Sequence, residues 1–203
     1  WDNKLVNKKI KKHNKVDLIY SANTLTHISN LDDVFSSINR LLCDEGILII
    51  EDPSLLECIK KVSYDQFYNE HIYVFSALSV QNILKKFNLE IFDIKNLNTH
   101  GGSLRYYIKK KKNNKFKIHK SVKQQLKIEI KFGLDKLSTY RKFAKLTLKS
   151  KTKLLSLLKN LKISGKKIIG YGATAKATTV LNYCKIDDNY IDYFLDTTPD
   201  KAN

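Results

Sequence analysis

Residues 64–71, Tyr-Asp-Gln-Phe-Tyr-Asn-Glu-His, place two tyrosines, two carboxylates and a histidine within eight consecutive positions. Histidine titrates near neutral pH, so the imidazole of His71 can accept a proton and return it later in a reaction. Glu70 is close enough in sequence to orient that ring, and the Tyr68 hydroxyl can donate a hydrogen bond to a developing oxyanion. If the segment is helical, Tyr68 and His71 share one face. A purely structural histidine is the alternative interpretation.

A second motif, Thr-His-Gly-Gly-Ser-Leu-Arg, occupies residues 99–105. Paired glycines permit positive φ angles and a close approach of the backbone to a ligand. His100 and Arg105 flank them and have the chemistry to meet a phosphate or a carbonyl group. The spacing alone, however, favours a simple glycine turn in a hairpin.

A third motif, Gly170-x-Gly172-x-x-Ala175, lies between an expected strand and an expected helix, and Asp196 ends the strand after that. This arrangement matches the dinucleotide-binding fingerprint in form. The N–H groups at such a helix start can hold a pyrophosphate. The motif therefore predicts a diphosphate near the helix start, and it leaves an NAD-linked oxidoreductase open as an alternative.

The elements around the first two motifs alternate between strands and helices, as is typical of an α/β fold. The apolar run at 16–20 predicts a buried strand, and the run at 47–50 predicts a strand covered on both faces. Ser76 is the candidate cap of a helix that extends to Phe87. The other expected elements are a helix at 31–42 and paired strands at 89–94 and 103–108.

The second half of the chain predicts long helices and then a new sheet. Residues 118–162 contain no proline and no turn cluster beyond Gly133, and their apolar spacing indicates two amphipathic helices or one interrupted helix. A strand at 167–169, a helix to Cys184 and a strand at 190–196 follow. The sequence thus predicts an α/β chain with a partial Rossmann-like sheet, long helices and the start of a second Rossmann-like domain.

Composition supports a globular chain of 203 residues, 42% hydrophobic and 28% charged. No apolar run approaches the roughly 20 residues of a membrane span, and the first residues lack a signal-peptide pattern, so a cytoplasmic location without membrane contact is expected. Three separated cysteines, Cys43, Cys58 and Cys184, argue against a zinc or disulfide framework within the chain. The chain has no methionine, even at position 1, which predicts a fragment.

The formal net charge of +17 suggests a basic RNA-binding protein as a further alternative. However, only Arg40, Arg105 and Arg141 are arginines among 37 basic residues. Phosphate clamps and base-reading sites favour the forked guanidinium of arginine over lysine. Because the lysines are also spread along the chain, they are expected on solvated helix faces, and no specific nucleic acid partner is expected.

Together these motifs resemble one family, the S-adenosylmethionine-dependent C-methyltransferases that act on nucleotide-linked keto-deoxysugars. The likeness runs through nearly the whole chain, in order, at 17–19, Ala22-Asn23, His27, 46–51, 68–71, 100–105, 170–176, Leu181-Asn182, Asp196, Pro199 and Lys201. The His-Gly-Gly-Ser-Leu-Arg and Gly-Tyr-Gly-Ala-x-Ala-Lys strings are specific in combination. Asn69 departs from the family, which more often shows histidine, so position 69 is given no proton-transfer role.

The resemblance implies three parts: an N-terminal zinc-binding module, a Rossmann-like methyltransferase domain and a C-terminal α/β domain. This chain resembles a fragment without the N-terminal part. Residues 1–112 would be the C-terminal half of the methyltransferase domain. Residues 113–203 would be a truncated C-terminal domain with a helical segment at 116–163 and a β-α-β unit at 165–196. S-adenosyl-L-methionine is then the expected cofactor, zinc is expected only in the missing module, and the fragment alone is expected to be inactive.

The resemblance also implies roles for individual residues. His71 would remove the proton next to the substrate's 4-keto group, with Glu70 orienting the imidazole and Tyr68 near the enolate, before the methyl transfer. The expected cofactor-binding residues are Ala22, Asn23 and His27. The expected substrate-binding residues are His100, Gly101, Gly102, Ser103, Arg105, Tyr171, Gly172, Ala173, Lys176 and Asn182. The expected partner is a nucleotide-sugar, while its identity, the stereochemistry and the oligomeric state stay open.

Overall fold

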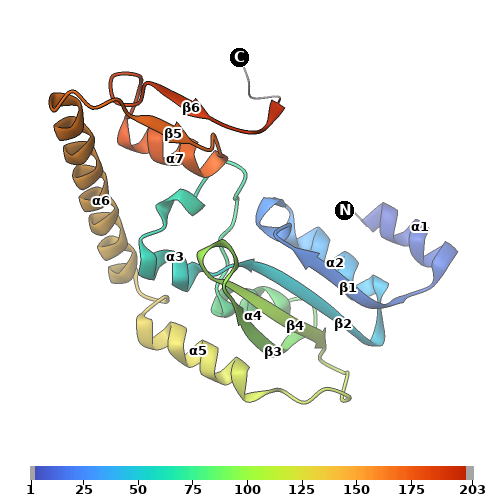
Figure 1. The fold of residues 1–203 in the computed structure, drawn as a ribbon. Helices are drawn as coiled ribbons and strands as arrows, with labels where there is room; N and C mark the ends of the chain where they lie inside the picture. The colour runs from blue at the N-terminus through green and yellow to red at the C-terminus, as the bar shows by residue number, and fades with distance from the viewer. Residues whose placement is uncertain (1–2, 200–203) are drawn as a thin grey trace.

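A computed structural model describes residues 3–199 and contains two sheets connected by long helices (Figure 1). The strands are β1 (Val16–Ala22), β2 (Leu42–Pro53), β3 (Leu89–Leu97), β4 (Ser103–Lys110), β5 (Ile169–Tyr171) and β6 (Tyr193–Leu195). The α-helices are α1 (Asn3–His13), α2 (Leu31–Leu41), α3 (Leu55–Lys61), α4 (Ala77–Lys85), α5 (Lys120–Phe132), α6 (Leu137–Ile163) and α7 (Ala175–Cys184). The predicted α/β class is confirmed. Lys201, part of the family likeness, lies outside the described residues.

The first sheet is mixed, with strand order β1-β2-β4-β3. β1 pairs parallel with β2, whereas β4 runs antiparallel to both β2 and β3. The expected hairpin of β3 and β4 is thus confirmed. A short 3₁₀ turn, Thr99–Gly101, joins these two strands and carries the glycine motif at the end of the sheet where β2 finishes.

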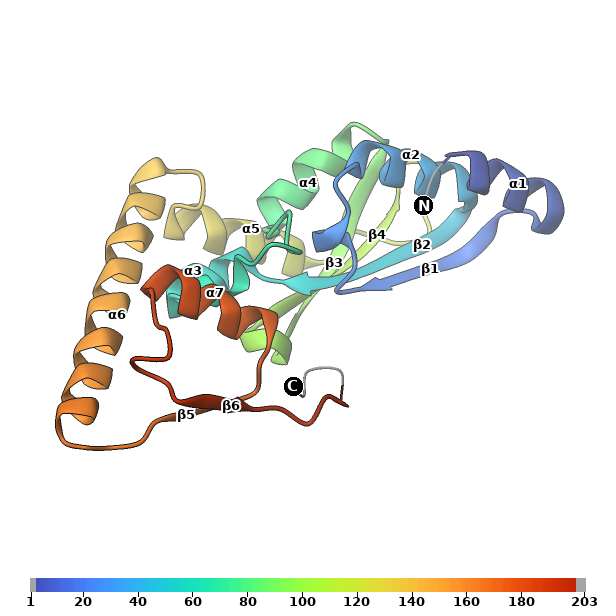
Figure 2. The same ribbon diagram turned by 90° about the horizontal axis from the view of Figure 1, so that it is seen from above.

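Helices α1, α2 and α4 lie on one side of this sheet (Figure 2). Phe35 of α2 and Leu84 of α4 pack there against Ile50 and Tyr106 of the central strands. On the opposite face, within residues 3–199, the apolar side chains are much less covered: Leu18 is 55% and Tyr20 57% exposed.

The predictions of a buried strand at 16–20 and of two-sided coverage at 47–50 are therefore wrong for the described residues. β1 is an edge strand, so its outer side has no neighbour within residues 3–199. In β2, Leu48 and Ile50 are buried, while Ile47 and Ile49, which point to the other face, are only half-buried. An apolar run indicates that its residues can be buried, but it does not show whether other elements of the chain cover one face of the strand or both.

The helical region at 118–162 divides into two helices at Gly133. This glycine has φ +86°, and a Cβ atom there would lie 2.9 Å from the hydroxyl oxygen of Thr139. The left-handed residue ends α5, and its N–H is bonded to the carbonyl oxygens of Glu129 and Ile130. α6 then turns away from the first sheet and runs up to the second (Figure 1).

Glu129 of α5 binds the start of α4, one of the helices that cover the first sheet. Its fully buried carboxylate accepts hydrogen bonds from the Ala77 and Leu78 N–H groups, each at 2.9 Å, and from Nε2 of Gln125 at 3.0 Å. These N–H groups begin α4, where the helix dipole favours a negative charge. Ser76 and Ser79 form a capping box at the same place, so the predicted cap is confirmed.

Replacing Glu129 by alanine is expected to lower the free energy of unfolding by about 2 kcal/mol, because two buried N–H groups lose their acceptors. Glu129→Gln keeps one acceptor oxygen and should lose about half as much. Urea unfolding of the three proteins measures both changes. Equal stability of all three would show that this contact does not hold α5 in place.

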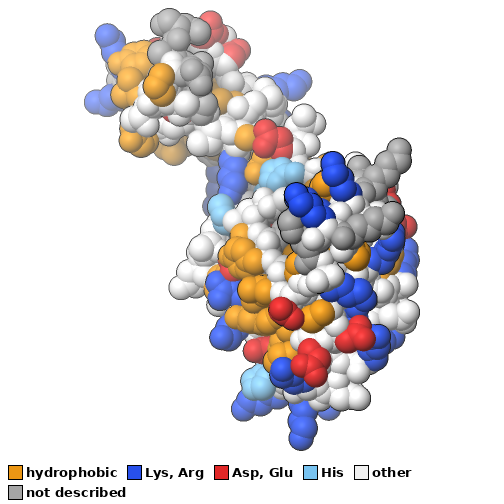
Figure 3. All heavy atoms as spheres, turned by 90° about the vertical axis from the view of Figure 1, so that its right-hand side faces the viewer, with side chains coloured by type: hydrophobic (Ala, Val, Ile, Leu, Met, Phe, Trp, Pro, Cys, Tyr) orange, Lys and Arg blue, Asp and Glu red, His pale blue; other side chains and the backbone are white. Residues whose placement is uncertain are grey.

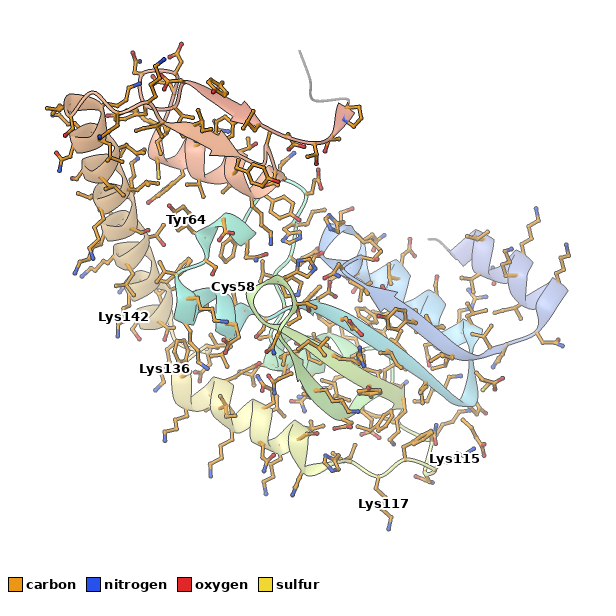
Figure 4. All side chains as sticks on the ribbon, viewed as in Figure 1. Cys58, Tyr64, Lys115, Lys117, Lys136 and Lys142 are labelled. Atoms are coloured by element: carbon orange, nitrogen blue, oxygen red, sulfur yellow. The ribbon has the colours of Figure 1, made fainter. Side chains whose placement is uncertain are left out.

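The second sheet consists of β5 and β6, which pair parallel, with α7 between them in the chain. Leu158 of α6 packs against Cys184, the last residue of α7, and against Ile186 just after it. Cys58 and Tyr64 lie where the first sheet approaches α6 and α7, while Lys115, Lys117, Lys136 and Lys142 extend outward (Figure 4). None of the helices in the described part of the chain is long and apolar enough to cross a lipid bilayer.

Candidate active site

The segment that carries His71 is a pair of tight turns and not a helix. A 3₁₀ turn covers Tyr64–Gln66, and the N–H of His71 bonds to the carbonyl of Tyr68 at 2.9 Å. The chain reversal nevertheless brings the two side chains together, with the Tyr68 hydroxyl 2.7 Å from Nε2 of His71. The expected proximity is present, but through a different local structure.

The partners of the His71 ring define its proton arrangement. Nδ1 lies 2.8 Å from the main-chain carbonyl oxygen of Gln66, which can only accept a hydrogen bond. Nδ1 therefore carries the proton, and in the neutral ring Nε2 accepts from the Tyr68 hydroxyl. The basic lone pair of His71 thus points at Tyr68.

Burial lowers the pKa of His71, and the neighbouring side chains of His27, Lys176 and His100 lower it further, against the opposing effect of the Gln66 carbonyl. The imidazole is therefore neutral at pH 7 and able to accept a proton. Burial and the negative charge of Glu70 raise the pKa of Tyr68, which keeps its hydroxyl protonated as a donor.

Glu70 was expected to orient the imidazole, and the structure corrects this detail. Both ring nitrogens are occupied, one by Tyr68 and the other by the Gln66 carbonyl. The physical reason is the tight turn, which directs a main-chain carbonyl at Nδ1 and leaves Glu70 on the exposed side. Glu70 acts on the site through its charge, next to Tyr68.

A cavity of about 290 Å³ lies between this segment and α7. Tyr68, Asn69 and Glu70 form one wall, and Ala175, Thr178, Thr179 and Asn182 form the other. Histidine side chains gather where the smaller upper part of the molecule meets the larger lower part (Figure 3). The two halves of the chain thus contribute opposite walls of one site.

Several expected site residues come together here. The rings of His27 and His71 lie 5.0 Å apart, edge to face. Lys176 and His100 are close enough to lower the pKa of His71. Asn182 lines the cavity itself. Two imidazoles and an ammonium group from three distant segments therefore surround one proton acceptor.

The expected cofactor residues lie at the end of β1. Ala22 lines a second cavity, of about 410 Å³, together with Thr24, Leu25 and Ile28. Asn23 adopts a left-handed conformation at φ +50°, and its N–H bonds to the Glu51 carbonyl at 2.8 Å. His27 belongs to the following 3₁₀ turn and extends toward His71 instead.

The His100-Gly101-Gly102 loop has three successive positive φ angles, +52°, +81° and +130°. Its carbonyl groups bind inward: that of His100 accepts from Nε2 of Gln66 at 3.0 Å, and that of Gly101 accepts from Nζ of Lys61. The Gly102 carbonyl accepts from the N–H of Ser54 at 3.0 Å. The buried hydroxyl of Ser103 bonds to the Thr99 carbonyl at 3.0 Å, so Ser103 also serves the loop.

The two glycines of this loop are expected to respond differently to alanine. A Cβ at Gly102 would lie 2.8 Å from Cγ of Glu57, whereas a Cβ at Gly101 would meet nothing within 4 Å. Gly101→Ala should cost about 1 kcal/mol of stability, from the positive φ alone, and Gly102→Ala about 2 kcal/mol or more. Chemical denaturation of both variants tests the difference, and equal losses would contradict the contact with Glu57.

Arg105, expected to bind substrate, forms an ion pair with Glu51 on the less covered face of the sheet. The same carboxylate accepts from the Tyr20 hydroxyl at 3.0 Å. Arg105 is therefore held by a carboxylate of the neighbouring strand β2 in this structure.

In the glycine motif of the second sheet, the carboxylate of Asp196 occupies main-chain N–H groups. The N–H of Ala173 donates to the Asp196 carboxylate at 2.7 Å, and the N–H of Thr198 donates to the other carboxylate oxygen at 2.9 Å. A diphosphate reaching Ala173 would have to displace this carboxylate. Gly172 has φ +85°, and Tyr171 is 83% exposed at the edge of the motif.

Within residues 3–199, no cluster of histidine, cysteine, aspartate and glutamate has the arrangement of a metal site. Gln66, which the sequence does not mark as a site residue, is 4% exposed and hydrogen-bonds to His71 and to the His100 carbonyl. Asp52, at the end of β2 and 1% exposed, is not marked as one either. The only signal for Asp52 was an acid at the end of an apolar strand.

The chain belongs to the C-methyltransferase family. Residues 98–203, more than half of the chain, match the family model described as the C-methyltransferase C-terminal domain. Residues 2–94 match a methyltransferase domain. The family resemblance seen in the sequence is confirmed. The glycine motif falls within the C-methyltransferase match, which removes the support for a dinucleotide-binding oxidoreductase.

Among characterised proteins, the chain is similar to the C-methyltransferase NovU of Streptomyces niveus. The two are 27% identical over 187 residues, which is 92% of this chain and 44% of NovU. The chain thus spans less than half the length of this curated relative. A solved structure with partial likeness is magnesium protoporphyrin IX methyltransferase (ChlM) from Synechocystis PCC 6803 with bound SAH. It is 18% identical, with TM-score 0.37, covering 47% of this chain and 45% of that one.

Proposed function

We propose that this chain is part of an S-adenosylmethionine-dependent enzyme that methylates a carbon atom of a nucleotide-linked keto-deoxysugar. The reacting carbon is the one next to the ketone, where a proton is acidic enough to be removed. The observation that carries the proposal is the neutral imidazole of His71, with its basic Nε2 directed at the Tyr68 hydroxyl beside a cavity between the two lobes.

In this proposal, the ketone oxygen of the substrate takes over the hydrogen bond of the Tyr68 hydroxyl. That exchange frees the lone pair of His71 Nε2, which accepts the proton from the adjacent carbon. The C–H electron pair becomes the enolate, and the negative oxygen is stabilised by the Tyr68 O–H. A base positioned in this way contributes about 10²–10⁴ in rate.

The positive charge near His71 supports an anionic intermediate. The ammonium group of Lys176 acts on the imidazole electrostatically, and the same positive charge stabilises an enolate forming beside it. This charge also makes His71 a weaker base, since it lowers the pKa of the imidazole. Lys176, at the start of α7, also suits the diphosphate of a nucleotide-sugar. Asn182, later in the same helix, offers an amide group for hydrogen bonds to the substrate.

The residues at the end of β1 fit one side of a methyl-donor site. The cavity beside Ala22 has mainly aliphatic walls, suited to a flat adenine ring, and Ser21 and Thr24 add hydroxyl groups to its lining. S-adenosyl-L-methionine supplies an electrophilic methyl group when bound. His27, from the same loop, links this region to His71. The similarity to NovU, a C-methyltransferase by name, supports carbon as the acceptor.

The test uses the complete protein that contains this chain, with methyl-labelled S-adenosylmethionine. A nucleotide-linked 4-keto-deoxysugar should gain label on carbon, whereas the same sugar reduced to the 4-hydroxyl compound should gain none. Label on an oxygen atom, or equal labelling of both sugars, would contradict a ketone-dependent deprotonation. Label transfer to RNA would favour the alternative suggested by the +17 charge.

A further inference from the structure

Gln66 hydrogen-bonds both to the ring of His71 and to the loop that carries His100. Its main-chain carbonyl accepts from Nδ1 of His71 at 2.8 Å, while its side-chain Nε2 donates to the His100 carbonyl at 3.0 Å. The side chain is almost fully buried, at 4% exposure, although the neighbouring residues Phe67 and Tyr68 are much more open.

The conformation of His100 needs this support. Its φ and ψ angles of 52° and 29° lie in the left-handed region, which costs a residue with a Cβ about 1 kcal/mol. Such strain persists only where surrounding contacts determine the conformation. The hydrogen bond from Gln66 to the His100 carbonyl is one of these contacts, and Lys61 and Ser54 bind the next two carbonyls of the loop.

The other atom of the Gln66 amide points to the same conclusion. Oε1 is buried and has no hydrogen-bond partner among the residues that the structure describes. A buried amide with an unpaired oxygen is less stable than an aliphatic side chain of similar size, unless its donor group is needed. Reversing the amide would place Oε1 against the His100 carbonyl, where two acceptors repel. The donor function is therefore what this glutamine supplies.

We propose that Gln66 is a positioning residue that holds His71 as its Nδ1–H tautomer and fixes the His100 loop beside it. The side chain anchors the peptide unit whose carbonyl binds Nδ1, so losing the anchor lets that carbonyl turn away. His71 can then carry its proton on Nε2, where it cannot act as the base. The consequence for catalysis rests on the proposed function, but the tautomer itself does not.

The experiment compares Gln66→Leu with unmodified protein by two-bond ¹H–¹⁵N correlation spectroscopy of the histidine rings, in the complete protein. His71 is assigned by its disappearance in His71→Gln. The ratio of Nδ1–H to Nε2–H tautomer of His71 should fall about fivefold or more, the change expected for the loss of one buried hydrogen bond. The ring resonances of His100 should shift as its loop relaxes.

The matched control is Gln125→Leu. Gln125 is also buried, at 5% exposure, and its Nε2 donates to Glu129 at 3.0 Å, away from the site. This control should leave the His71 tautomer unchanged. If Gln66→Leu does not fold, Gln66→Glu replaces it, because a carboxylate has the same shape and cannot donate to His100.

An unchanged tautomer ratio in the folded Gln66 variant, or the same change in Gln125→Leu, overturns the proposal. In the methyl-transfer assay, Gln66→Leu should lower kcat about fivefold while KM stays within about twofold, as expected for a misplaced base and intact binding. A tautomer shift without any methyl transfer by the unmodified protein would support the positioning role and reject the proposed reaction.

Discussion

Replacing His71 by glutamine in the complete protein is expected to lower kcat/KM for methyl transfer by about 10²–10⁴, the contribution of a positioned general base. Glutamine keeps a hydrogen-bonding side chain but has no nitrogen that accepts a proton near neutral pH. Because burial and neighbouring side chains lower the pKa of His71, the rate should fall only on the acid side of neutrality as the imidazole becomes protonated. Steady-state kinetics over a range of pH measure both effects.

His119→Gln provides the control for this substitution. His119 caps the start of α5, its side chain is 59% exposed, and it is not among the residues that line the cavity. The same chemical change there should leave kcat/KM within about twofold. If both substitutions reduced the rate equally, the effect would reflect stability and His71 would lose its role as the base.

The second large effect concerns Asp52 at the end of β2. Asp52 is 1% exposed, so its carboxyl group is removed from water. Burial raises the pKa of Asp52 from 3.8 to about 7, with the backbone N–H of Thr26 opposing the shift and Glu51 adding to it. The folded protein therefore takes up a proton here that the unfolded chain releases.

The sign of the pH dependence follows from this raised pKa. The contribution of Asp52 is fully present below pH 3.8 and is lost as pH rises through about 7. A shift of about three units corresponds to about 4 kcal/mol. Asp52→Asn, which stays neutral, should therefore be more stable than the unmodified protein by up to about 4 kcal/mol above pH 7, and little different near pH 4.

Urea unfolding of Asp52→Asn and the unmodified protein at several pH values tests this dependence. Tyr106 lies near Asp52 in the same core, and its hydroxyl is buried without a partner among the described residues. Tyr106→Phe removes that hydroxyl and serves as the control, since it should change stability equally at all pH values below about 9. A stability difference for Asp52→Asn that is constant with pH would contradict a buried, proton-binding carboxyl.

Local signals in the sequence predicted local structure well. Ser76 caps α4, Gly133 separates α5 from α6, and residues 89–94 and 103–108 pair as an antiparallel hairpin. Each of these depends on interactions within a few residues, or on one tight connection. The exposed side of β1 was not predicted, because it depends on which other segments of the chain cover the sheet. Helix α3 was also missed, although Ser54 caps it locally by accepting from the N–H of Glu57.

For the candidate site, the sequence indicated which kinds of residue come together better than it indicated which atoms bind each other. Tyr68 and His71 meet as expected, but a main-chain carbonyl and not Glu70 binds Nδ1. A backbone acceptor leaves no trace in a sequence, and neither does a buried glutamine such as Gln66. Asp196 had the spacing of a ribose-binding acid, yet it accepts from Ala173 in its own motif. The spacing of residues in a sequence can thus indicate that a residue lies near a site, but it does not determine which group that residue hydrogen-bonds.

The most direct measurement is solvent exchange at the substrate carbon next to the ketone, in deuterium oxide and without the methyl donor. The complete protein should exchange that proton for deuterium, and His71→Gln should lower the exchange rate by about 10² or more while the nucleotide-sugar still binds. Binding is measured separately by calorimetry. Undiminished exchange in His71→Gln, with the ketone bound, would contradict the central role given to this imidazole.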